Sequence, residues 1–110
     1  QQRLVEAGGG LQAAGDSVLL SCRGFGFDFD FWVYRVWWYR QAAGGGLEWL
    51  SVISSDASVV KFGQSVEGRA TASRDDSRSE SSLSLRALHP RDSARYFCAV
   101  PTETGNPAEL

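Results

Sequence analysis

The two cysteines are the residues whose chemistry is most constrained by their place in the chain. Cys22 and Cys98 are the only cysteines present, and each lies in a segment of alternating apolar residues typical of a strand. A pair of buried, reduced thiols in a cytosolic protein is the alternative to a disulfide. The placement in two strand-like segments favours the disulfide, which would contribute about 4–5 kcal/mol in the loop-entropy model, as an upper figure. We therefore expect an oxidising, extracellular environment.

Patterns that would support catalysis or metal binding are weak. His89 is the single histidine, and its H-P-R-D context indicates a turn far along the chain from any candidate nucleophile. Serines are abundant, but no nucleophile elbow is present. The pairs Asp28/Asp30 and Asp75/Asp76 lack the glycine-spaced oxygen ligands of a calcium loop. We predict neither an enzyme nor a metal or cofactor site.

Length and composition indicate one globular domain. The chain has 110 residues, of which 43% are hydrophobic and 22% charged, and this supports a single core. Eleven basic residues are dispersed among thirteen acidic ones for a net charge of −2, and the lack of a basic stripe argues against nucleic acid as the partner. No apolar run approaches about 18 residues, so we expect no membrane span. No charged-then-apolar leader follows Gln1, so we expect a signal peptide to be absent or already removed.

Short segments between frequent turns indicate an all-β chain. Val18, Leu20 and Cys22 alternate onto one face of such a segment. The glycine-rich stretch 42–46 is typical of a hairpin connection. The expected strands are residues 4–6, 17–22, 38–41, 47–53, 70–74, 81–86 and the segment ending at Cys98. No helix of useful length is predicted.

Several motifs in a fixed order give the chain a family resemblance. A tryptophan pair, Trp37-Trp38, lies between the cysteines, and Tyr96 stands two residues before Cys98 in a D-x-A-x-Y-x-C segment. The other motifs are V-E-A-G-G-G-L at 5–11, W-Y-R-Q at 38–41, G-L-E-W at 46–49, S-V-E-G-R at 65–69 and S-R-D at 73–75. Over roughly residues 1–100 the chain resembles the variable domain of an antibody heavy chain, or of a heavy-chain-like T-cell receptor chain such as the mu or delta type.

The resemblance implies an all-β fold, the V-type immunoglobulin sandwich of two sheets with Greek-key connections, as a single domain over residues 1–110. In that fold a disulfide between Cys22 and Cys98 joins the facing sheets. Trp38 packs against this disulfide, whereas Trp37 points elsewhere, and Tyr96 fixes a corner of the chain.

The resemblance also implies a salt bridge between Arg69 and Asp92, with two unrelated surface charges as the alternative. Ala70, Ala72 and Ser81 fall where heavy chains usually place larger apolar side chains. We therefore expect the core to be thinner at that end.

The end of the sequence departs from the family pattern. Residues 99–110 lack the W/F-G-x-G motif that opens the last strand of a variable domain. A sandwich without that strand would expose a sheet edge. We therefore expect the strand to be missing from this sequence rather than from the natural domain.

By position, the three hypervariable loops are residues 27–36, 54–61 and 100 onward. The first loop is crowded with aromatic residues, which give large contact area at low entropic cost. Trp32, Tyr34 and Arg35 are therefore predicted to contact a ligand, with cover for a neighbouring loop or subunit as the alternative. The second loop is small and polar and suits adaptable hydrogen bonding, or simple solvation. The candidate antigen-binding residues are Asp30, Phe31, Trp32, Tyr34, Arg35, Ser55, Asp56, Ser58, Thr102, Glu103 and Thr104.

A second candidate surface is a partner-domain face made of Tyr39, Gln41, Leu47, Trp49 and Phe97. In conventional heavy chains, leucine and tryptophan at the Leu47 and Trp49 positions pack on a second variable domain, and exposed they would add to an apolar patch. Single-domain antibodies of camelids favour phenylalanine or tyrosine at the Tyr39 position. The chain mixes both patterns, so pairing with a light chain or other receptor chain and an unpaired domain both stay open.

The expected function is recognition of a protein or peptide antigen by the loops, without chemistry. The domain would be extracellular, either secreted or part of a cell-surface receptor. One alternative is a non-rearranging cell-surface V-type domain that serves adhesion or signalling. Another is a structural domain that supports a partner receptor chain.

Overall fold

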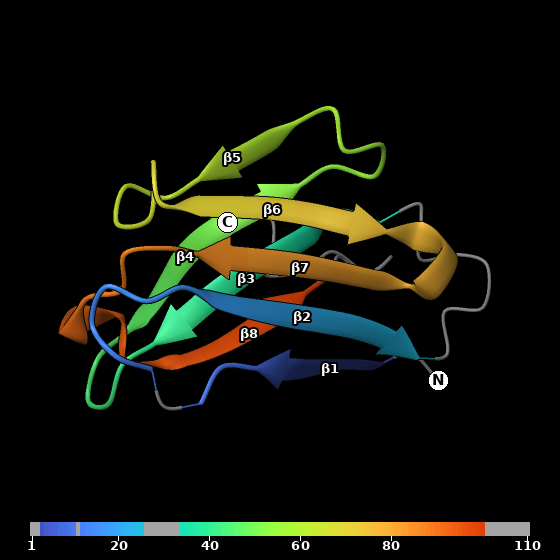
Figure 1. The fold of residues 1–110 in the computed structure, drawn as a ribbon. Helices are drawn as coiled ribbons and strands as arrows, with labels where there is room; N and C mark the ends of the chain where they lie inside the picture. Colours follow the sequence, from blue (N-terminus) through green and yellow to red (C-terminus); the bar gives the residue numbers. More distant parts are fainter. Residues whose placement is uncertain (1–2, 11, 26–33, 101–110) are drawn as a thin grey trace.

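The computed structural model describes residues 3–10, 12–25 and 34–100, and these form two facing antiparallel sheets (Figure 1). The first sheet has the order β1-β2-β7-β6, with β1 (Arg3–Gly8), β2 (Val18–Phe25), β7 (Glu80–Leu85) and β6 (Ala70–Asp75). The second has the order β5-β4-β3-β8, with β5 (Val60–Phe62), β4 (Leu47–Ile53), β3 (Val36–Gln41) and β8 (Arg95–Ala99). Two short 3-10 turns, η2 (Asp76–Arg78) and η3 (Pro90–Asp92), precede β7 and β8. The predicted all-β, two-sheet fold is confirmed.

The core fills the space between the sheets. Cys22 on β2 and Cys98 on β8 form a disulfide that joins the two sheets, as predicted. Trp38 is fully buried beside them, while Trp37 points to the other face of β3 and is half-buried. Period-two alternation thus decides which of the two adjacent tryptophans enters the core. Leu20, Val36, Leu50, Ile53, Val66, Leu83 and Leu85 complete the buried cluster.

Two loop boundaries predicted from the sequence are wrong. Val36 was placed at the end of the first loop, but it begins β3, pairs with Ile53 of β4 and is fully buried. Val60 and Lys61 were placed in the second loop, but they belong to β5 and pair with β4. In both cases pairing with β4 extends the sheet beyond the expected strand end. The second loop is therefore shorter than predicted, and Lys61 lies within β5, where it pairs with Val52.

The small residues Ala70, Ala72 and Ser81 contact the core from β6 and β7. Ala70 and Ala72 are half-buried against the cluster, and Ala72 pairs with Leu83 across β6 and β7. Ser81 is fully buried, and its hydroxyl donates a hydrogen bond of 2.7 Å to the carbonyl oxygen of Ser73. The polar atom is therefore satisfied, as a buried hydroxyl requires.

β8 is an edge strand of its sheet within the described part of the chain. The first strand partly covers this edge. The backbone N–H of Cys98 donates to Oε2 of Glu6, 3.0 Å away. A carboxylate from the opposite sheet thus takes one hydrogen bond that a further strand could otherwise accept.

A buried charge cluster ties the sheets together near η3. The Asp92 side chain is only 4% exposed. Its carboxylate accepts hydrogen bonds from Nη1 of Arg40 on β3 (2.8 Å) and from both terminal nitrogens of Arg69, just before β6 (2.9 and 3.1 Å). The backbone N–H of His89 adds a fourth donor at 2.8 Å. Asp92 therefore meets both Arg69, as expected, and Arg40, which had no assigned role.

Tyr96 completes this cluster. Its hydroxyl donates to the backbone carbonyl of Asp92 (2.6 Å) and accepts from Nη1 of Arg40 (3.0 Å). Burial opposes ionisation of Asp92, but the hydrogen bonds from Arg69, His89 and Arg40 outweigh it, and the pKa of Asp92 lies well below its usual range. Burial also raises the pKa of Tyr96, so its hydroxyl stays protonated and able to donate.

Replacing Asp92 with asparagine is expected to lower the free energy of unfolding by about 3–5 kcal/mol at pH 7, because it leaves two arginines without their buried counter-charge. The folded pKa is depressed, so this contribution is present above the unfolded pKa of about 3.9 and is lost as the pH falls through the folded value. Urea unfolding at several pH values measures it. The exposed Glu67→Gln is the matched control, and an equal loss in both variants at pH 7 would contradict the assignment.

Candidate binding surface

The first loop reaches the described part of the chain at Tyr34 and Arg35, immediately before β3. Arg35 is exposed, whereas Tyr34 is half-buried and packs against the core cluster. Part of the Tyr34 surface therefore serves the scaffold. Asp30, Phe31 and Trp32 of the first loop, and Thr102, Glu103 and Thr104 of the third, lie outside the described residues, and their ligand contacts stay predictions.

The second loop forms a turn that is stabilised by hydrogen bonds to the carboxylate of Asp56. Oδ1 of Asp56 accepts hydrogen bonds from the hydroxyl of Ser54 (2.9 Å) and from the backbone N–H and hydroxyl of Ser58 (2.9 and 2.7 Å). The bonds from the Ser58 side chain and backbone and from Ser54 lower the pKa of Asp56 to about 2. Asp56 and Ser58, predicted to contact antigen, thus also hold the turn in shape. Ser55 forms no such bond within the described residues and is half-buried.

Arg74 positions both loops, a role that the sequence reasoning missed. Its side chain is 3% exposed, and Nε pairs with Asp76 at 2.8 Å. Nη1 donates to the carbonyl oxygens of Tyr34 (2.7 Å) and Ser54 (2.9 Å). One signal was available in the sequence, because Arg74 alternates with Ala70 and Ala72 on the inward face of β6.

The five residues of the predicted partner-domain face lie together on the outer face of the second sheet. Tyr39 pairs in register with both Trp49 and Phe97, and Gln41 pairs with Leu47. The rings of Tyr39 and Phe97 stack with centroids 6.1 Å apart. Leu47 is 55% exposed, and the indole N–H of Trp49 is anchored to the carbonyl oxygen of Ser51 at 3.0 Å. The arrangement makes one continuous face with an apolar, partly exposed centre.

A cavity of about 520 Å³ lies between the two loops, on the same outer face. Its lining combines Arg35 of the first loop and Ser54 and Val59 of the second with side chains of three strands. The strand residues are Trp37, Trp49, Val52 and Lys61.

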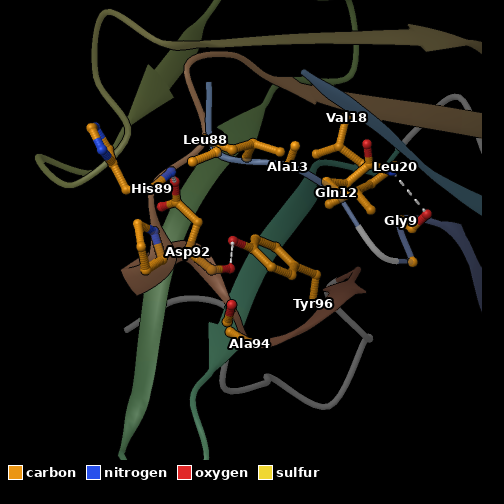
Figure 2. Close-up of a pocket in the computed structure, with 14 residues that line it drawn as sticks. Gly9, Gln12, Ala13, Val18, Leu20, Leu88, His89, Asp92, Ala94 and Tyr96 are labelled. Atoms are coloured by element: carbon orange, nitrogen blue, oxygen red, sulfur yellow. Dashed lines mark hydrogen bonds between the residues drawn. The ribbon is translucent and has the colours of Figure 1, made fainter. Parts of the chain in front are cut away.

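A second cavity, of about 390 Å³, lies beside η3 (Figure 2). Some of its polar groups bond to one another. Gln12 donates to the carbonyl oxygen of Gly9 at 3.3 Å, and Tyr96 donates to that of Asp92. This hollow therefore belongs to the packing of the charge cluster.

No group of three or more histidine, cysteine, aspartate or glutamate side chains within residues 3–10, 12–25 and 34–100 is placed to hold a metal ion. His89 is exposed and precedes η3. None of the helices among these residues is long and apolar enough to cross a membrane.

A comparison with models of known protein families matches residues 11–109 to the immunoglobulin V-set domain. The matched segment includes both cysteines and every residue of the two candidate surfaces.

Replacing Arg74 with lysine is expected to loosen the second loop, because a single ammonium group cannot reproduce the bonds to Asp76 and to two carbonyl oxygens. Faster amide exchange should appear at Ala57, whose N–H donates to Ser54, and the free energy of unfolding should fall by about 1–3 kcal/mol. Hydrogen exchange followed by NMR measures the effect. The exposed Arg78→Lys is the control, and unchanged exchange at Ala57 in Arg74→Lys would contradict the positioning role.

Replacing Ser58 with alanine should raise the pKa of Asp56 from about 2 toward its ordinary value of 3.8, because the hydroxyl bond is the largest cause of the shift. Carboxyl carbon shifts followed by NMR during an acid titration report this pKa. Ser55→Ala should leave it unchanged. A pKa of Asp56 near 3.8 in the unsubstituted protein would show that the turn is not organised by its carboxylate.

Proposed function

Because the chain belongs to the immunoglobulin V-set domain family, we propose that it is the variable domain of an antibody heavy chain or of a heavy-chain-like T-cell receptor chain. Its function is recognition of a protein or peptide antigen. The observation that carries this proposal is the cavity of about 520 Å³, whose lining joins Arg35 of the first loop and Ser54 and Val59 of the second to side chains of three strands. Arg74 fixes the backbone of these two loops from beneath, which leaves Arg35, Ser55 and the rim of the turn available to a ligand.

Domains of the V-set family generally bind other proteins or pair with other chains, and they are typically extracellular, where the Cys22–Cys98 disulfide persists. We propose that residues 1–110 form a single such domain. We further propose that a second variable domain packs on the partner-domain face. The 55% exposure of Leu47 beside the half-buried, stacked rings of Tyr39 and Phe97 supports this, because adjoining apolar side chains that remain partly exposed are typical of an interaction surface.

Without its partner, the domain is expected to self-associate through this face. Size-exclusion chromatography with light scattering should show a mass that rises with concentration, and Leu47→Glu should return the domain to a monomer. Leu19→Glu is the matched control, since Leu19 is 62% exposed on the other sheet, and it should leave association unchanged. A clean monomer of the unsubstituted domain at tens of micromolar would favour an unpaired binding domain.

Sequencing of individual lymphocyte transcripts tests the antigen-receptor assignment. Clones that share the segment up to Ala99 should differ in the residues that follow it and should then converge on a joining strand. One invariant continuation in every clone would overturn the assignment and favour a fixed cell-surface domain for adhesion or signalling.

A further inference from the structure

Part of the lining of the cavity between the loops comes from residues that pair across three neighbouring strands. Trp37 of β3 pairs with Val52 of β4, and Val52 pairs with Lys61 of β5. Trp49 lies two pairs along β4 and is fixed by its bond to Ser51. Because these residues sit on adjacent strands of one sheet, the scaffold sets this part of the cavity wall, and Arg35, Ser54 and Val59 of the loops complete the lining.

The wall of the cavity is mainly apolar. Trp37 and Trp49 are half-buried, and Val52 is only 9% exposed. Val59 of the second loop also lines the cavity and is 47% exposed. Two indole rings and two valines therefore offer a slot for one apolar side chain, of the kind that anchors a protein ligand.

The rim of the cavity is positively charged. Arg35 and Lys61 both line it and are both exposed, and neither forms a hydrogen bond or ion pair with another described residue. No acidic side chain is among the described residues that line it. The nearby Asp56 has Oδ1 engaged by three donors from its own turn. Charge complementarity therefore favours an anionic group beside the apolar slot.

We propose that this cavity binds an acidic peptide segment of a protein ligand. A glutamate or aspartate carboxylate meets Arg35 and Lys61, and a neighbouring apolar side chain lies between Trp37 and Trp49. The apolar wall exceeds what a free phosphate could use, and two cations are too few for a nucleic-acid backbone. The proposal rests on the proposed function, because it names the ligand chemistry recognised at the same end of the domain.

The probes are two short peptides that differ only in charge, acetyl-Phe-Glu-amide and acetyl-Phe-Gln-amide. Each is titrated to millimolar concentration while the indole N–H signals of Trp37 and Trp49 are followed by NMR. Both peptides should move these signals, and the glutamate peptide should bind roughly five-fold more tightly, as expected for two exposed charge pairs. The double variant Arg35→Ala/Lys61→Ala should bind both peptides equally.

Arg95→Ala is the matched control. Arg95 is an exposed arginine at the start of β8, where it pairs with Gln41, and it does not line the cavity. This variant should keep the preference for the glutamate peptide. Equal binding of the two peptides by the unsubstituted domain, no binding of either, or shifts that avoid Trp37 and Trp49 would each overturn the proposal. Transcripts that vary after Ala99 would still support antigen recognition in that event, so the two failures are distinguishable.

Discussion

The carboxylate of Asp92 is removed from water and held by Arg40 of β3 and by Arg69, which immediately precedes β6. Burying a charge in this way is costly unless every lone pair finds a donor. Here Arg40, Arg69 and the backbone of His89 supply four hydrogen bonds, and Tyr96 bonds to the carbonyl oxygen of the same residue. Since Arg40 lies on β3 and Arg69 leads into β6, the relative position of the sheets is fixed at this end. The disulfide and Trp38 then fix it at the centre.

The end of the domain that carries the first and second loops is stabilised by a different set of hydrogen bonds. Arg74 is buried and donates to backbone carbonyl oxygens of Tyr34 and Ser54, while Asp56 receives the donors of its own turn. These bonds fix main-chain positions and leave exposed side chains such as Arg35 out of the supporting network. A binding surface of this kind can change its chemistry without changing its support, as expected when recognition is carried by loops on a rigid scaffold.

The sequence was most informative where a family motif assigns a role to a residue. The W-Y-R-Q motif singled out Trp38 rather than Trp37 as the core tryptophan, and the motif order identified the fold and the Arg69–Asp92 pair. It was least informative for buried arginines to which the resemblance assigned no partner. Arg40 reaches Asp92 across 52 positions, and Arg74 reaches Tyr34 across 40. Alternation along β6 indicates that Arg74 faces inward, but the distant partner of neither arginine can be read from its neighbours in the sequence.

The candidate site was predictable in part for the same reason. Loop positions follow from the family motifs, but the cavity depends on the register that sets Trp37, Val52 and Lys61 side by side. In the same register, β4 also pairs with Val36 and Lys61, which were predicted to lie in the first and second loops but belong to β3 and β5. The contacts of Trp32 and Glu103, outside the described residues, stay predictions.

The central claim is that the scaffold carries the stability, while Arg35, Ser55 and Lys61 at the loop end of the domain carry recognition. The most direct test is urea unfolding of the triple variant Arg35→Ala/Ser55→Ala/Lys61→Ala beside the core variant Leu83→Ala, whose side chain is fully buried. The account predicts a change within about 1 kcal/mol for the triple variant and a loss of about 2–5 kcal/mol for the core variant. A loss in the triple variant as large as that in Leu83→Ala would contradict it.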